Sequence, residues 1–135
     1  MGMYTTFRCI CLVKQEYIEY IKEISDGNAE WKDFKKEMPF VKKFSNLGRA
    51  DFIPNGSMSA YNEDKFYKES FSEINKWGIW NFCCDLKNYG SEIETFIYEV
   101  LPKLCEQINF CAYWYEEDDY PKIVFEKEIF KNEVW

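Results

Sequence analysis

The amino-acid sequence predicts an α+β fold in which helices cover one face of a largely antiparallel sheet. Two observations lead to this prediction. Apolar residues alternate with a period of two in some segments, as in strands, and recur about every 3.6 residues in others, as in helices. The chain has 135 residues, 47% of them apolar, which is enough for the core of one domain spanning 1–135.

The chain begins with a strand and a helix. Residues 4–14 predict a strand in the middle of the sheet, because both of its faces are apolar. A helical pattern over 17–24 follows, with isoleucines on one face and charged residues between them. Asp26-Gly27-Asn28 should end this helix, since Gly27 can adopt the left-handed conformation of a helix cap.

Shorter elements are expected next. Residues 31–38 and 39–44 predict two helical pieces, the second beginning at a proline, which the first turn of a helix tolerates. Residues 49–54 predict a short strand that ends at the turn Pro54-Asn55-Gly56. The polar stretch 57–68 predicts a long loop.

The second half contains the clearest local signals. A turn at 75–78 leads into a strand over 79–87, in which apolar residues alternate. Ser91-Glu92-Ile93-Glu94 has the sequence of a capping box, in which the serine hydroxyl accepts the amide proton of Glu94. It predicts a helix that continues to Ile108 and bends at Pro102.

Two strands, 110–116 and 122–128, are expected to end the chain as a hairpin across the acidic turn 117–121. The order is then strand, helix, helix, short strand, strand, helix, strand, strand. This order predicts a ferredoxin-like sandwich with an added C-terminal hairpin.

The six cysteines indicate a reducing compartment. They lie in apolar, strand-like runs, and no secretory signal precedes them, so we expect free thiols in a cytoplasmic protein, with Cys9, Cys11, Cys83 and Cys84 buried. A zinc site made of cysteines alone stays open, although paired C-x-x-C knuckles are absent. Met1-Gly2 stands before a second methionine and resembles a cloning remnant, with the natural start at Met3.

Several kinds of chemistry are excluded or disfavoured. The chain has no histidine, which removes Ser-His-Asp and Cys-His catalysis and metal sites built on imidazole. It has no glycine-rich phosphate loop and no G-x-S-x-G motif. Asp85 and Lys87 share one strand face and Glu94 is near in sequence, but an acid–base pair would require burial. We therefore expect no enzyme, no catalytic residues, no cofactor and no metal.

The charge is unevenly distributed. Residues 1–70 contain 11 basic and 11 acidic side chains, whereas residues 71–135 contain 6 and 13, so the net charge of −7 arises in the second half. An acidic surface disfavours direct binding of nucleic acid and favours a protein partner with a basic surface. No apolar run approaches the roughly 18 residues of a membrane span. A homo-oligomer stays open.

The predicted partner-binding site is the start of the terminal hairpin, where the densest aromatic run meets the densest acidic run. Aromatic side chains are typical interface anchors, and carboxylates beside them can orient a basic partner. Metal binding by the acidic turn and a merely solvated turn are alternatives. The site residues are Trp114, Tyr115, Glu116, Glu117, Asp118 and Asp119.

An alternative ligand-binding site is the basic cluster in the first half. Lysine and arginine suit phosphate, so the cluster could hold a phosphorylated small molecule or a signalling nucleotide. The simpler interpretation is the solvated side of an amphipathic helix. The cluster consists of Lys32, Lys35, Lys36, Lys42, Lys43 and Arg49.

The segments 80–89, 92–94, 100–102 and 113–117 give a strand-LKNY-helix-VLP-YWYEE pattern. This pattern resembles a group of small bacterial and prophage proteins over roughly residues 40 to 120. The group has no established activity, so the resemblance implies no catalytic residues. It implies a protein carried by a phage or a mobile element, where inhibitors and immunity factors are common.

The leading functional hypothesis is a non-enzymatic binding protein that occludes a protein partner, as a phage-encoded or mobile-element-encoded inhibitor of a bacterial defence system would. An immunity protein that neutralises a toxin is one alternative. A sponge for a phosphorylated small ligand or a signalling nucleotide, bound at the basic cluster, is the other.

Overall fold

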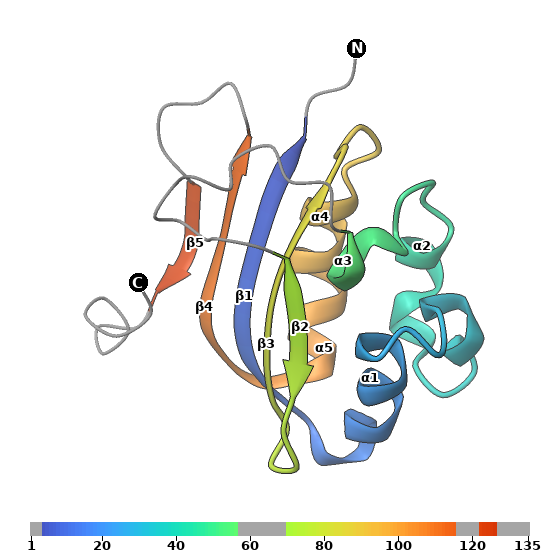
Figure 1. Cartoon of the computed structure of the whole chain (residues 1–135). Helices are drawn as coiled ribbons and strands as arrows, with labels where there is room; N and C mark the ends of the chain where they lie inside the picture. The colour runs from blue at the N-terminus through green and yellow to red at the C-terminus, as the bar shows by residue number, and fades with distance from the viewer. Residues whose placement is uncertain (1–3, 57–69, 116–121, 127–135) are drawn as a thin grey trace.

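The fold is α+β, with a five-stranded antiparallel sheet and a layer of helical segments on one of its faces (Figure 1). The computed structural model describes residues 4–56, 70–115 and 122–126. The strands follow the order β2-β3-β1-β4-β5 across the sheet. Their bounds are β1 Thr5–Val13, β2 Phe71–Ile74, β3 Ile79–Leu86, β4 Cys105–Tyr115 and β5 Lys122–Glu126.

The first strand, β1, lies in the centre of the sheet, as the sequence predicts. It pairs antiparallel with β3 on one side and with β4 on the other, so that Cys9 is opposite both Phe82 and Cys111. Phe7 belongs to the large core under the helices, whereas Ile10 belongs to a second buried cluster. Both faces of β1 are therefore buried, which is why both faces carry apolar residues.

The helical layer is made of short segments. In the first half these are η1 Gln15–Tyr17, α1 Ile18–Ser25, η2 Trp31–Phe34, η3 Pro39–Val41, α2 Lys42–Ser45 and α3 Phe52–Asn55. In the second half one continuous helical stretch consists of α4 Glu92–Thr95, η4 Phe96–Val100 and α5 Leu101–Leu104. α1 buries Ile18, Ile21 and Ile24, and Gly27 takes the expected left-handed conformation behind it, with φ 81°.

Aromatic rings fill the space between the sheet and the helices. Phe96 is in the middle of this cluster, with ring centroids 5.2 Å from Phe44, 5.4 Å from Trp31 and 5.8 Å from Phe7. The rings meet mostly edge to face, the arrangement that aromatic quadrupoles favour. Through these ring contacts, η2, α2 and η4 pack against β1.

The expected strand over 49–54 is wrong. The chain turns there instead, because the amide of Phe52 donates to the Arg49 carbonyl and the amide of Ile53 donates to the Ala50 carbonyl. α3 follows, with a cis peptide bond before Pro54. The edge strand next to β3 is β2, Phe71–Ile74, which the sequence did not predict because it is short and only half apolar. The expected loop over 57–68 lies outside the described residues.

The expected helix from 91 to 108 ends earlier, at Leu104. Cys105 is already extended, with φ −114° and ψ 145°, and pairs with Val13 at the start of β4. The apolar residues of this run fit both the helical and the strand period, so the element that packs beside it decides which structure forms. Here that element is β1, and the run becomes a strand. The helix widens into a π-helical turn at η4 just before Pro102, which lacks an amide proton for a helical hydrogen bond.

The predicted capping box does not form. Ser91 is left-handed, with φ 60°, and its side chain makes no cap hydrogen bond. Asn88 takes this role from further upstream: its Oδ1 accepts the amide proton of Ile93 at 2.8 Å, and its Nδ2 donates to Glu94 Oε1 at 2.8 Å. The loop before α4 places the amide of Asn88, and not the Ser91 hydroxyl, at the helix start.

All six cysteines are buried and free, which confirms the prediction for Cys9, Cys11, Cys83 and Cys84. Cys9 faces Cys111 across the β1–β4 ladder in the large core, and Cys83 lies in the second buried cluster. None of the helices in the described part of the chain is long and apolar enough to cross a membrane.

Candidate functional site

The predicted partner-binding site is only partly described. Trp114 is 7% exposed, so its ring is buried inside the protein. It packs in the second buried cluster with Ile10, Cys83, Phe110 and Ala112. Tyr115 is half-buried and lines a surface pocket. Glu116, Glu117, Asp118 and Asp119 lie outside the described residues. Of the expected anchors, Tyr115 is therefore the one that the structure places at a surface.

The basic cluster does not converge on a pocket. Lys32 pairs with Glu30 at 3.1 Å and Lys43 pairs with Glu99 at 3.0 Å. Arg49 lies over the ring of Tyr89, 5.3 Å from its centroid. None of the six residues lines either of the two pockets described below. The exposed members are Lys32, Lys35, Lys36, Lys42 and Lys43, and Arg49 is half-buried.

Asp85 and Glu94 do not meet as an acid–base pair. Asp85 is buried and its Oδ1 accepts a hydrogen bond from the Thr6 hydroxyl at 2.7 Å. Thr6 lies opposite Trp114 in the neighbouring strand, so these side chains occupy the sheet face away from the large core. Glu94 belongs to α4 on the helical face.

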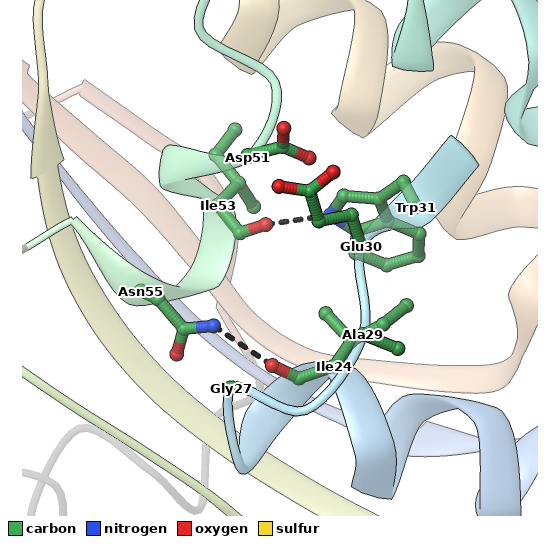
Figure 2. A pocket seen from close by; sticks show the side chains of 8 residues that line it. All are labelled: Ile24, Gly27, Ala29, Glu30, Trp31, Asp51, Ile53 and Asn55. Atoms are coloured by element: carbon green, nitrogen blue, oxygen red, sulfur yellow. Dashed lines mark hydrogen bonds between the residues drawn. The ribbon is translucent and has the colours of Figure 1, made fainter. Parts of the chain in front are cut away.

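A pocket of about 240 Å³ lies between α1 and α3 (Figure 2). Its base is apolar and aromatic, and carboxylates of Glu30 and Asp51 lie together at one side of it, as Figure 2 shows. We call it the Glu30–Asp51 pocket. It is lined by Ile24, Gly27, Ala29, Glu30, Trp31, Asp51, Ile53 and Asn55.

Two hydrogen bonds hold the walls of this pocket. Trp31 Nε1 donates to the Ile53 carbonyl at 2.6 Å, which joins η2 to α3. Asn55 Nδ2 donates to the Ile24 carbonyl at 2.8 Å, which joins α3 to the end of α1. Both bonds reach a main-chain carbonyl, so the pocket shape depends on backbone positions and is largely preformed.

The two carboxylates repel each other. Burial raises the pKa of the Asp51 carboxyl above its ordinary value, the charge of Glu30 raises it further, and the charge of Lys32 lowers it. Lys32 forms an ion pair with Glu30, and both side chains are exposed. The cationic head of a lysine or arginine side chain in the pocket would relieve this repulsion. The apolar stem of the same side chain would contact Ile24, Ala29 and Ile53.

Sequence reasoning did not single out Glu30 or Asp51. Each resembles an ordinary surface acid beside a turn, and they come from segments that only the tertiary structure brings together. Trp31 begins a segment that was expected to be helical, and it is fully buried. No pattern in the sequence pointed to this pocket.

A second pocket, of about 190 Å³, lies at the end of the sheet where β1 begins and β4 ends. We call it the tyrosine pocket, because three tyrosines line it beside a carboxylate and an amide. Its residues are Thr5, Asn88, Tyr89, Glu94, Tyr113 and Tyr115. In the described part of the chain, no group of three or more cysteine or acidic side chains is arranged to hold a metal ion.

The chain was compared with family profiles, curated proteins and solved structures, and none of them matches it.

Proposed function

We propose that this protein is a non-enzymatic binding protein that occludes a protein partner with a basic surface. The observation that carries the proposal is the Glu30–Asp51 pocket (Figure 2). A lysine or arginine side chain combines an apolar stem with a cationic head, and the pocket combines apolar walls with two carboxylates. One such side chain of the partner would be the anchor, and the two carboxylates would orient it.

The pKa of Asp51 gives the pH dependence of this interaction. Because the pKa is raised, Asp51 takes up its proton at a higher pH than an ordinary aspartate. A protonated Asp51 no longer attracts a cation. Binding of the basic partner should therefore weaken as the pH falls through this raised pKa, and it should be strongest at neutral pH.

The first test uses the tagged full chain and lysate of the natural host. Wild type is compared by quantitative mass spectrometry with Glu30→Gln/Asp51→Asn, which removes both pocket charges. The matched control is Glu19→Gln/Glu23→Gln, which removes two exposed charges of α1 outside the pocket. A protein retained by wild type and control but lost from the pocket variant supports the proposal. Equal retention by all three contradicts it.

The second test needs no natural partner. A short arginine-rich peptide, a glutamate-rich peptide and a short DNA duplex are titrated into the chain by calorimetry at low and moderate salt. The arginine-rich peptide should bind, and the pocket variant should weaken it about tenfold, as the loss of one charge-assisted contact predicts. Binding of the DNA duplex instead would overturn the proposal.

The strand order supports a finer assignment of the fold. We infer a ferredoxin-like sandwich, because two strand–helix–strand units with strands β1 to β4 in the order β2-β3-β1-β4 are expected for it. β5 is then the added hairpin strand beside β4.

The resemblance to small bacterial and prophage proteins supports a more specific proposal, namely an inhibitor of a bacterial defence system. An immunity protein is the alternative within the same class. Genomic neighbourhood separates the two: a run of phage genes favours the inhibitor, and an adjacent toxin gene favours the immunity protein.

A further inference from the structure

We propose that the tyrosine pocket binds a nucleoside monophosphate, with the base against the tyrosine rings and the phosphate at the neighbouring cations. This inference does not rest on the proposed function, because it concerns other residues and another kind of ligand. Four separate segments build the pocket: the start of β1, the loop before α4, α4 itself and the end of β4.

The pocket offers flat apolar surface. Tyr113 and Tyr115 are half-buried on β4, and Tyr89 is 59% exposed on the loop. Stacking on such rings is a general way to bind a base, since every base has two flat faces. The volume of about 190 Å³ suits a small planar group better than a peptide segment.

The pocket also offers one oriented acceptor. Asn88 is fixed by the amide proton that it accepts from Ile93, and it donates in turn to Glu94 Oε1. Within the described part of the chain, no hydrogen bond reaches Glu94 Oε2. A carboxylate oxygen only accepts, so the matching edge of a ligand must carry N–H donors, as the guanine edge does.

Cations stand beside the tyrosines. Lys122 lies over the Tyr113 ring, 5.6 Å from its centroid, and Arg49 lies over Tyr89 at 5.3 Å. A hydrogen bond to Tyr113 raises the pKa of Lys122, so this lysine stays charged at neutral pH. Both cations suit a phosphate.

This charge balance decides between two kinds of ligand. Tyrosines and a carboxylate could also form a cage for a cation. Here the rings of Tyr89 and Tyr113 already carry Arg49 and Lys122, so a cation stands against each of these rings. These two side chains would repel a further cation and attract an aromatic ligand that carries an anionic group.

The test is calorimetric titration of the full chain with guanosine 5′-monophosphate, guanosine, inorganic phosphate and tetramethylammonium. The monophosphate should bind most tightly, guanosine more weakly and inorganic phosphate weakest. Bound monophosphate should also raise the thermal midpoint, because a ligand of the folded state stabilises it. Absence of monophosphate binding, or tighter binding of tetramethylammonium, overturns the proposal.

Matched variants locate the site. Tyr89→Ala and Glu94→Gln should each weaken the monophosphate about tenfold, as loss of one stacking or hydrogen-bonding contact predicts. Trp77→Ala, at a ring 68% exposed, and Glu106→Gln, at an exposed glutamate, lie outside the pocket lining and should leave binding unchanged. Equal losses in pocket and control variants would show that the ligand binds elsewhere.

Lys122→Gln provides a separate readout. It should weaken the monophosphate and leave guanosine unaffected, because the lysine faces the phosphate and not the base. Equal weakening of both ligands contradicts this placement. Thermal unfolding in the absence of ligand is measured for every variant. Tyr115→Leu replaces Tyr89→Ala as the stacking test if that variant unfolds early, because it removes another ring of the pocket lining and should likewise weaken the monophosphate.

Discussion

Asp51 lowers the stability of the folded protein at neutral pH, because its carboxyl group has a raised pKa. Its pKa is raised by burial first and by the charge of Glu30 second, so the folded chain binds this proton more tightly than the unfolded chain does. Ionised Asp51 therefore lowers the free energy of unfolding at neutral pH, and the loss disappears as the pH falls below the raised pKa. Its side chain makes no helix-cap hydrogen bond that would offset this loss.

Asp51→Asn should accordingly raise the free energy of unfolding at neutral pH and leave it nearly unchanged at acid pH. Urea denaturation at both pH values measures the difference. Glu23→Gln, at an exposed glutamate of α1, is the control and should show no such pH-dependent gain. A less stable Asn variant at neutral pH would mean that the carboxylate makes a stabilising contact.

Phe96 is the residue on which the aromatic core depends most. It is fully buried and touches rings from η2, α2 and β1. Phe96→Ala should lower the free energy of unfolding by about 3–5 kcal/mol, because it removes a buried ring and leaves a cavity. Phe52→Ala, at a ring 47% exposed, should cost less than about 1.5 kcal/mol in the same denaturation series.

At the scale of elements, the structure at the start of α4 differs from the one that the sequence motif predicts. The S-E-I-E motif predicts a serine cap, but Asn88 binds the Ile93 amide and Ser91 is left-handed. Asn88→Ala should lower the free energy of unfolding by about 1 kcal/mol. Ser91→Gly should raise it by up to about 1 kcal/mol, because glycine adopts the left-handed conformation without strain.

Chemical denaturation of both variants distinguishes the two caps. The capping box would make Ser91→Gly neutral or slightly destabilising, and Asn88→Ala harmless. Opposite signs for the two substitutions are expected only if Asn88 is the capping side chain.

The sequence predicts well those elements whose spacing of apolar residues fits either a strand or a helix, but not both. The alternating run at 79–86 and the apolar run at 5–13 are strands as expected, since both are buried by neighbours that match their faces. The segment 105–108 fits a helix and a strand equally, and only pairing with β1 decides it. Residues 49–54 look extended because of their apolar character, but local hydrogen bonds turn the chain there.

At the scale of the whole molecule, the cysteines give a simple test of the core. All six are buried, and burial raises the pKa of the Cys83 and Cys84 thiols. Thiolates are the reactive form. Hydrogen bonds with Cys105 and Cys9 lower the pKa of Cys11 to about 5, so for that thiol it is burial that keeps the reagent out. The folded protein should therefore react slowly with a thiol reagent. Six thiols should titrate rapidly after denaturation without reductant. Fewer than six would contradict free cysteines.

The two pockets could not be predicted from sequence, although much of the sheet could. Glu30 and Asp51 become a pair only because α3 turns back toward η2, where Trp31 donates to the Ile53 carbonyl. Tyr115 was expected at a surface for its place beside the acidic run, yet its neighbour Tyr89 comes from the loop before α4. Such sites arise from packing between distant segments, and periodicity reports only on neighbours along the chain.

The central position of β1 has a consequence for the order of assembly. Its two partners, β3 and β4, both lie in the second half of the chain, so β1 is synthesised well before either of its edges can be paired, and β3 becomes available before β4. Each pairing closes a long loop, which slows folding. During synthesis β1 is therefore an exposed apolar segment with two open edges, the kind of segment that chaperones bind or that aggregates.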